Sequence, residues 1–302
     1  MPVMWTFEAI GTQWNIELYG TEAAGIDTTA LQAAVQRRIA VFDRDYSRFR
    51  SDSLVSAMAR QAGMYTLPAD AKPLFDVYHQ LYLLSDGKMT PLIGRLLADA
   101  GYDANYSLQA GRLQRPPAWD DVLDYQFPAL TIKQPVLLDF GAAGKGYLVD
   151  IIGDMLRLHG VRNFVVDAGG DSLCRTPPGQ AARIGLEHPG DPSQAIGVAT
   201  IANRSLCGSA GNRRRWASFH HIMDPVTLLS PEHIRAVWVV AGTTILADAL
   251  TTGLYFMTPE VLQPHFDFEY AIVRQDYSLE HSTQFPAVFF TKERLPHAAH
   301  HR

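Results

Sequence analysis

LDFGAAGKGY, residues 138–147, is the stretch of this 302-residue chain that decides its fold. The apolar residues that lead into it, 136–139, predict a short strand, and a helix is expected from Gly146 to about His159. A glycine-rich turn at such a junction exposes backbone N–H groups and directs a helix N-terminus toward bound phosphate. Lys145 can add a positive charge to the same anion. The glycines also suit a tight turn without a ligand, and the spacing is neither a Rossmann fingerprint nor a complete P-loop, so both interpretations stay open.

Amphipathic segments precede this turn. Trp14, Ile16 and Leu18 alternate with polar residues, which predicts a half-buried strand. Helices are expected after the capping residues 27–28 and after Asp70, each with one apolar face. These faces comprise Leu31, Val35, Ile39 and Phe42 in the first helix and Leu74, Tyr78 and Leu81 in the second.

The second half of the chain predicts a series of strands with few helices between them. The expected strands cover residues 163–167, 183–187, 197–201, 237–241, 269–273 and 287–290. Residues 112–129, rich in proline, aromatic and acidic side chains, are expected to form a surface excursion. Because strands follow one another with few helical crossovers, we expect an α+β fold with mixed, largely antiparallel sheets and packed helices. No linker divides the chain, so we expect one domain over residues 1–302.

The composition narrows the possible partners. A net charge of −5 argues against nucleic acid as a partner, because such binders usually carry a basic surplus. No apolar run approaches the roughly 18 residues that span a bilayer, and residues 1–14 lack the pattern of a signal peptide. We therefore expect no membrane anchor and a cytoplasmic location. Cys174 and Cys207 form no metal-like spacing and are expected to be buried thiols.

An acid and a threonine share one face of a predicted helix late in the chain. Asp248 and Thr252 are four residues apart, so they project within about 40° of each other. Two hard oxygen ligands in this arrangement suit Mg²⁺. Both residues are also common in helices that bind no metal, so a structural role remains the alternative.

Two further segments carry side chains that suit catalysis or binding. His220 and His221 follow the arginine run 213–215, and a histidine can accept a proton near neutral pH, with Asp224 to orient it. The alternatives are a structural histidine and a solvated arginine face. The second segment, residues 167–171, has two aspartates around paired glycines, which can bind a ribose, a metal or amides, or simply form a turn.

Eight blocks in this order resemble the ApbE family, the FAD:protein FMN transferases. The resemblance extends from about Gly11 to Thr258. The blocks are residues 11–14 (GTQW), 46–53 (YSRFRSDS), 86–91 (DGKMTP), 138–147 with Asp150 a turn later, 163–171 (NFVVDAGGD), 209–212 (SAGN), 221–225 (HIMDP) and 247–252 (ADALTT).

The resemblance implies a T-fold-like architecture and a set of ligand-binding residues. Family members bind Mg²⁺ through the residues that match Asp248 and Thr252 and through a backbone carbonyl that falls on Gly144. His221 is then the candidate for proton transfer, and Lys145 is expected near the FAD diphosphate. The residues expected to line the FAD cleft are Ile10, Phe49, Lys88, Met89, Thr90, Gly141, Lys145 and Tyr147.

The resemblance also implies a reaction. Such an enzyme transfers FMN from FAD to a serine or threonine hydroxyl of an acceptor flavoprotein and releases AMP. An FAD pyrophosphatase and a non-catalytic FAD-binding protein are the alternatives. The departures from the family pattern include Ile10 for methionine, Thr90 for aspartate and Gly144 for alanine, and they fall mostly around the flavin.

Overall fold

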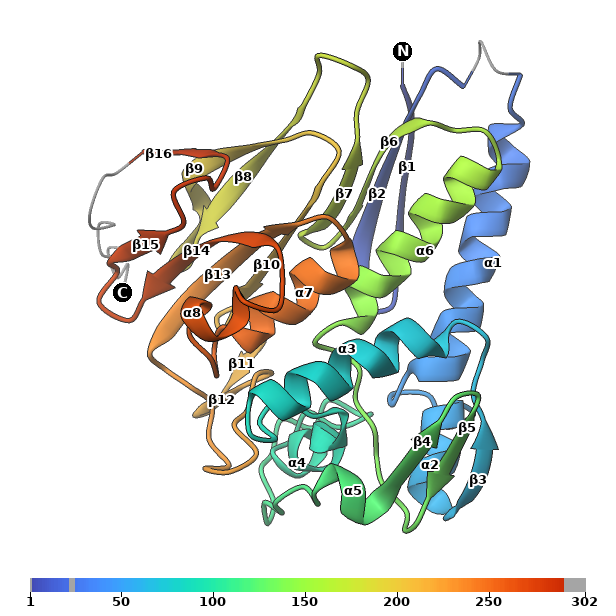
Figure 1. Cartoon of the computed structure of the whole chain (residues 1–302), viewed down its shortest axis with the longest axis vertical. Coiled ribbons are helices and arrows are strands. Elements are labelled where there is room, and N and C mark those ends of the chain that lie inside the picture. Colours follow the sequence, from blue (N-terminus) through green and yellow to red (C-terminus); the bar gives the residue numbers. More distant parts are fainter. Residues whose placement is uncertain (1, 22–24, 291–302) are drawn as a thin grey trace.

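The frame of the protein is an eight-stranded antiparallel sheet, seen in a computed structural model that describes residues 2–21 and 25–290 (Figure 1). The strands pair in the order β1-β2-β6-β7-β10-β13-β14-β15. Their bounds are β1 Val3–Ala9, β2 Thr12–Tyr19, β6 Asn163–Ala168, β7 Asp171–Arg175, β10 Ser205–Ala210, β13 Ile234–Ala241, β14 Phe268–Arg274 and β15 Leu279–His281. Together with the helices, this sheet confirms the predicted α+β class.

Three small sheets and eight α-helices complete the described part of the chain. The small sheets are β3 (Gly63–Thr66), β5 (Ala129–Ile132) and β4 (Leu123–Gln126); β16 (Ala287–Phe289), β9 (Asp191–Ile201) and β8 (Ala182–His188); and β11 (Arg215–Trp216) with β12 (Phe219–His220). The helices are α1 Thr28–Tyr46, α2 Leu54–Arg60, α3 Ala71–Leu84, α4 Gly94–Asp99 after a 3₁₀ turn at Pro91–Ile93, α5 Trp119–Val122, α6 Gly144–Leu158, α7 Thr244–Gly253 and α8 Pro259–Leu262.

Both faces of the central sheet are covered. Helices α1, α6 and α7 lie on one face, and the β8–β9 hairpin lies against the other (Figure 1). Strand β13 shows the result, because Val237 and Val239 belong to the helix-side core while Trp238 and Val240 belong to the hairpin-side core. A strand buried on both faces reads as an apolar run instead of an alternation, as residues 236–241 do.

Helices α6 and α7 cross at Gly146, and there a carboxylate of each helix accepts hydrogen bonds from backbone amides of the other. A Cβ atom at Gly146 would lie 2.4 Å from the carbonyl oxygen of Thr244 and 2.6 Å from the Cβ of Asp248, so only glycine fits this crossing. The amide of Gly146 donates to Oδ2 of Asp248 at 2.8 Å. In return, Asp150 of α6 accepts the amides of Thr244 and Ile245, at 2.9 and 2.8 Å. Two free N–H groups at the start of α7 are thereby satisfied by the neighbouring helix.

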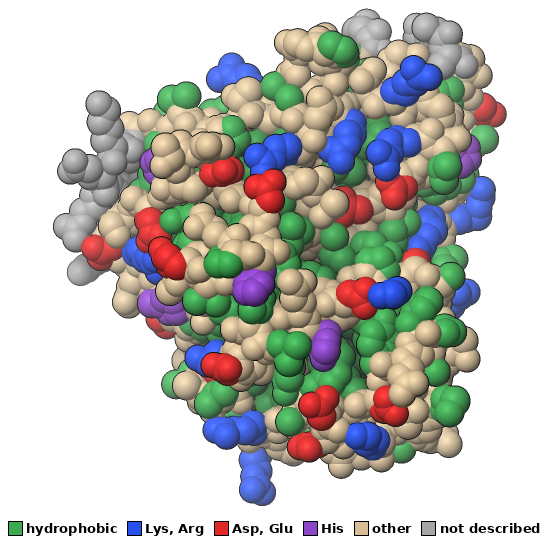
Figure 2. All heavy atoms as spheres, viewed as in Figure 1, with side chains coloured by type: hydrophobic (Ala, Val, Ile, Leu, Met, Phe, Trp, Pro, Cys, Tyr) green, Lys and Arg blue, Asp and Glu red, His purple; other side chains and the backbone are tan. Residues whose placement is uncertain are grey.

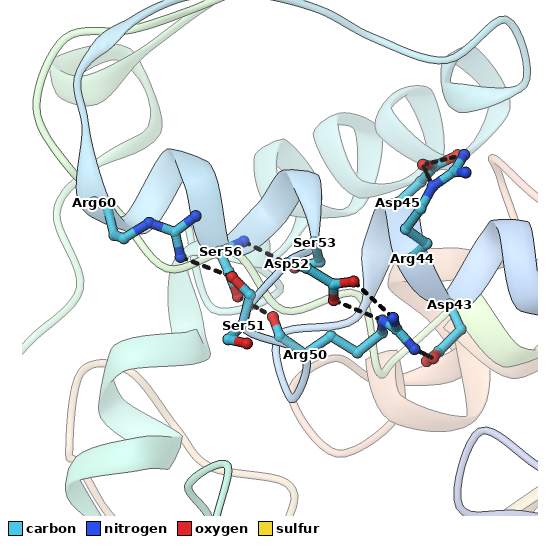
Figure 3. A network of polar contacts seen from close by, with 9 residues as sticks. All are labelled: Asp43, Arg44, Asp45, Arg50, Ser51, Asp52, Ser53, Ser56 and Arg60. Atoms are coloured by element: carbon cyan, nitrogen blue, oxygen red, sulfur yellow. Dashed lines mark hydrogen bonds and ion pairs between the residues drawn. The ribbon is translucent and has the colours of Figure 1, made fainter.

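A polar network fixes the segment that leaves α1 and carries the Arg48–Phe49 pair (Figure 3). Arg50 contacts Asp43 on α1 at 3.3 Å and Asp52 at 2.8 Å. Ser53 then caps α2, and the hydroxyl of Ser56 donates to the carbonyl of Arg50. Both sides of the turn at residues 47–53 are therefore held by side chains.

The surface view matches the modest net charge. Figure 2 shows acidic and basic side chains interspersed over one face, with groups of apolar side chains between them. Within residues 2–21 and 25–290, no helix is both long and apolar enough to cross a bilayer.

Most predicted elements are present, with shifted ends. The strand at Trp14–Leu18, the helices after Asp27 and Asp70, and all six later strands are confirmed, and Cys174 and Cys207 are buried thiols. The predicted strand at 136–139 is wrong: its amides bond singly, Val136 to the carbonyl of Met58 in α2 and Asp139 to that of Pro91 in the 3₁₀ turn, instead of to a neighbouring strand.

Two boundaries need correction. Helix α6 begins at Gly144, two residues earlier than predicted. The prediction of a surface excursion at residues 112–129 was only half correct. The second half of this segment forms α5 and β4, and Trp119 is buried beside Tyr82.

Replacing Gly146 by alanine tests the helix crossing. The new methyl group must push α6 and α7 apart, so we expect Gly146→Ala to lower the free energy of unfolding by about 1–3 kcal/mol. Chemical denaturation followed by circular dichroism measures the change. Gly242→Ala is the control, because nothing lies within 4 Å of its added Cβ. Equal stability of the two variants would contradict the tight crossing.

Candidate active site

Two adjoining cavities, of about 410 and 680 Å³, meet beside the glycine-rich turn. Phe49, Gly141 and Lys145 line both. The smaller cavity, called the reaction cavity here, also contains Lys88, Met89, Thr90, His221, Asp248 and Thr252. The larger one, called the side cavity, contains Ile10 and Gly144. Residues from all eight blocks of the resemblance therefore converge on one region.

Tyr147 is the one predicted residue that lines neither cavity. Its ring packs edge-on against Phe42, and its hydroxyl donates to the carbonyl of Asp70 at 2.7 Å. The structure therefore gives Tyr147 a packing position that connects α6 to the start of α3.

The amides of the glycine-rich turn are used inside the protein. Gly141 donates to Oδ1 of Asp139 at 2.7 Å, Ala142 to the hydroxyl of Tyr78 at 3.1 Å, and Gly144 to the carbonyl of Phe140 at 2.7 Å. The amide of Gly146 bonds to Asp248, as described above. Of the two interpretations left open for this turn, these bonds favour a tight turn whose amides serve the protein itself. An anion bound here needs charge from side chains or a metal ion.

Lys145 is already engaged in an ion pair. Its ammonium group contacts Oδ2 of Asp171 and donates to the carbonyl of Ala168 at 3.0 Å. Asp171 and Asp248 hold the pKa of Lys145 above its usual value, although burial opposes the shift. Lys145 thus remains charged, but its ammonium group is held by a carboxylate in the free protein.

The other residue of the double-glycine segment, Asp167, accepts the hydroxyl of Ser172 at 2.6 Å. Its partner across the turn, Asp171, therefore carries the contact to Lys145 alone. Of these aspartates, Asp171 pairs with Lys145, which lines both cavities, and Asp167 bonds within its own hairpin.

Asp248 is a buried carboxylate in the wall of the reaction cavity, with only 4% of its surface exposed. Burial raises its pKa well above the usual value, and the negative charge of Asp171 adds to this shift. Lys145 and the amide of Gly146 oppose the shift. A carboxylate whose charge is disfavoured in this way gains most from a nearby cation.

The donor atoms at this position fit a hard divalent cation. Asp248 offers a carboxylate and Thr252 a hydroxyl in the reaction cavity. Gly144, whose backbone carbonyl the resemblance adds to this set, lines the adjoining side cavity. Within the described residues, no three His, Cys, Asp or Glu side chains gather as a metal-binding group. A soft or fully protein-held metal does not suit so few charged ligands. Mg²⁺ does, because it is commonly held by one or two carboxylates together with water and substrate phosphates.

His221 lines the reaction cavity in its neutral form. Burial, followed by the positive charge of Arg214, lowers its pKa to about 3. Within the described residues its Nδ1 has no hydrogen-bond partner. His220 instead bonds to the carbonyl of Pro231, so only one of the two histidines faces the cavity. This division agrees with the expectation for neighbouring residues on an extended chain.

Asp224 does not orient His221. Its Oδ1 accepts the amides of Val226 and Thr227, at 2.7 and 3.2 Å, and its Oδ2 lies 3.5 Å from the ammonium group of Lys88. The carboxylate of Asp224 therefore stabilises its own turn and contacts Lys88, which corrects the prediction that Asp224 orients the histidine. The side chains of the arginine run are exposed, but Arg213 and Arg214 line both cavities.

Two residues that shape the turn were not predicted as such from the sequence. Arg48 is buried, forms an ion pair with Asp139 and lies over the rings of Phe49 and Tyr102. Tyr78 reaches the turn from α3 to accept the amide of Ala142. The spacing of apolar residues after Asp70 predicted only that Tyr78 lies on the inward face of a helix. Arg48 lay inside a recognised block, but its partner is 91 residues away.

Known proteins with this fold and sequence pattern belong to one family. The ApbE family profile matches residues 10–267. The FAD:protein FMN transferases of Klebsiella pneumoniae and Vibrio cholerae are both 23% identical to this chain; they align with 85% and 83% of it, and with 79% and 80% of their own lengths.

Solved structures agree with this assignment at the level of the fold. The ApbE protein of Thermotoga maritima superimposes with a TM-score of 0.83 at 20% identity, over 94% of this chain and 98% of its own. The flavin transferase ApbE of Vibrio cholerae gives a TM-score of 0.79 at 21% identity, over the same shares. Since the profile match spans most of the sequence and includes every block around the two cavities, this chain is a member of the ApbE family.

Proposed function

We propose that this protein transfers FMN from FAD to a serine or threonine hydroxyl of an acceptor flavoprotein, with Mg²⁺, and releases AMP. One observation carries the proposal: the reaction cavity combines a buried carboxylate, a threonine hydroxyl, a lysine and a neutral histidine. Family membership supports the reaction class, since the curated relatives bear the name FAD:protein FMN transferase.

The charge balance of the cavity supports dependence on a metal ion. The turn amides are occupied and Lys145 is paired with Asp171, so attraction for a diphosphate rests on Arg213 and Arg214, which line both cavities, and on a bound cation. Asp248, Thr252 and the carbonyl of Gly144 are the groups that would hold Mg²⁺. When bound, the ion supplies the charge that stabilises phosphoryl transfer.

The remaining residues position the reactants. The acceptor oxygen forms a bond to the phosphorus on the riboflavin side, the bond from that phosphorus to the AMP oxygen breaks, and AMP departs. His221 is uncharged at neutral pH and accepts the hydroxyl proton. Phe49 and the segment 88–90 line the space for the flavin nucleotide.

An assay with purified protein, FAD and Mg²⁺ tests the reaction, with and without an acceptor flavoprotein. We expect AMP release that depends on the acceptor, together with covalent flavin on the acceptor protein. AMP release at the same rate without an acceptor would assign an FAD pyrophosphatase instead. Tight FAD binding with no AMP would assign a binding protein.

Replacing Asp248 by asparagine tests the metal site. Asparagine keeps an oxygen that accepts the Gly146 amide but removes the charge, so the fold should persist while FMN transfer falls by at least about 100-fold. In-gel flavin fluorescence of the acceptor measures transfer, and a thermal melt checks the fold.

Asp154→Asn is the matched control for this variant. Asp154 is an exposed carboxylate on α6, paired with Arg157, and its loss should leave transfer unchanged. Transfer by Asp248→Asn at the wild-type rate, or wild-type transfer in excess EDTA, would contradict a metal at this position.

The pH dependence of stability tests the environment of His221. Folding lowers its pKa from 6.5 to about 3, so the folded protein binds fewer protons than the unfolded chain between these values. The free energy of unfolding therefore falls as the pH decreases through this window. At roughly 1.4 kcal/mol per pH unit, His221 accounts for up to about 2 kcal/mol of the loss between pH 6.5 and 5.

His221→Gln should remove that contribution. Denaturation at pH 7.5 and at pH 5 gives the loss of stability for each protein, and the variant should lose less than the wild type. An equal loss in both would show that His221 titrates normally in the folded state.

A further inference from the structure

Asp171 is a buried carboxylate next to the reaction cavity that no step above uses. It is the first residue of β7, directly after the double glycine, and only 1% of its surface is exposed. Its Oδ2 holds the ammonium group of Lys145. Within residues 2–21 and 25–290, its Oδ1 has no hydrogen-bond partner. A buried carboxylate oxygen without a donor is costly, so this atom calls for a ligand or a nearby cation.

The surroundings of Asp171 carry an excess of negative charge. Lys145 connects Asp171 to the proposed metal ligands: it pairs with Asp171, lines the reaction cavity with Asp248, and is followed by Gly146, whose amide bonds to Asp248. When both carboxylates are ionised, this group carries one negative charge more than Lys145 compensates. A divalent cation bound by Asp248 would compensate it.

We propose that Asp171 is a positioning residue of the metal centre, which holds Lys145 at the cavity wall and adds the second negative charge that draws a divalent cation to Asp248. The inference rests on the proposed metal-dependent function. It assigns opposite effects to the two partners of one ion pair: Asp171 favours the cation, whereas Lys145 opposes it in the absence of phosphate.

Direct measurement of metal binding tests this assignment without relying on activity. Mn²⁺ is used as the probe, and the free ion is counted by its electron paramagnetic resonance signal in titrations of the full-length protein without FAD and with FAD. We expect Asp171→Asn to raise the Mn²⁺ dissociation constant by about tenfold or more. Lys145→Gln should lower the dissociation constant several-fold in the titration without FAD, because Asp171 is then uncompensated.

Asp167→Asn is the matched control. It makes the same charge change on the same hairpin, but at a carboxylate that bonds to Ser172, and it should change the dissociation constant by less than about twofold. Thermal melts show whether each variant is folded.

The outcomes separate this inference from the proposed function. Wild-type protein that binds no Mn²⁺ under either condition would overturn the metal centre, and the role of Asp171 with it. Wild-type binding with an unchanged constant in Asp171→Asn would overturn the role of Asp171 alone. A higher Mn²⁺ dissociation constant in Lys145→Gln than in the wild type would also overturn the role of Asp171, because damage to the fold weakens Mn²⁺ binding in both variants. The Lys145→Gln titration gives this result even where Asp171→Asn does not fold.

Discussion

The candidate site depends on the reciprocal hydrogen bonds between α6 and α7, in which a carboxylate of each helix accepts backbone amides of the other. Gly146 lets the two helices meet at a distance that admits no side chain. Asp248 then caps the first turn of α6, while Asp150 caps the first turn of α7. Because each helix satisfies the other's free amides, neither can shift without leaving polar groups unpaired in the core. Gly144 and Asp248, which are proposed to hold the metal ion, are thereby fixed relative to one another.

This arrangement changes how the cavity attracts an anion. In a P-loop the backbone amides themselves bind phosphate. Here the amides of the turn are bonded to Asp139, Tyr78, Phe140 and Asp248. They therefore fix the conformation of the turn but contribute little to the binding of an anion. Attraction comes instead from side chains, Lys145 and the exposed Arg213 and Arg214 that line both cavities, and from the cation proposed to bind at Asp248. That cation would make the affinity for a diphosphate depend on the metal.

The sequence was most informative where the chemistry is local. The spacing of Asp248 and Thr252 placed them on one helix face, and the alternation at Trp14–Leu18 placed a strand, because both patterns depend on neighbours a few residues away. The blocks of the resemblance marked the segments that converge on the cavities.

What the sequence could not give was the pairing between blocks. Lys145 was expected to be free for phosphate, but Asp171, 26 residues away, holds it. The turn amides were expected to be exposed, but Tyr78, 64 residues before Ala142, takes one of them. Partners of this kind are fixed by tertiary packing alone.

The protonation state of His221 depends on the charged groups that surround the reaction cavity. In the free protein it lies among positive groups, Arg214 and Lys145 included, and burial removes the water that would stabilise its charged form. Its pKa is therefore far below the value that suits a base at neutral pH. A diphosphate in the cavity would bring negative charge to the same place and would raise that pKa. In the proposed reaction, proton acceptance by His221 thus becomes favourable only when the diphosphate is present, so the substrate itself would prepare the base.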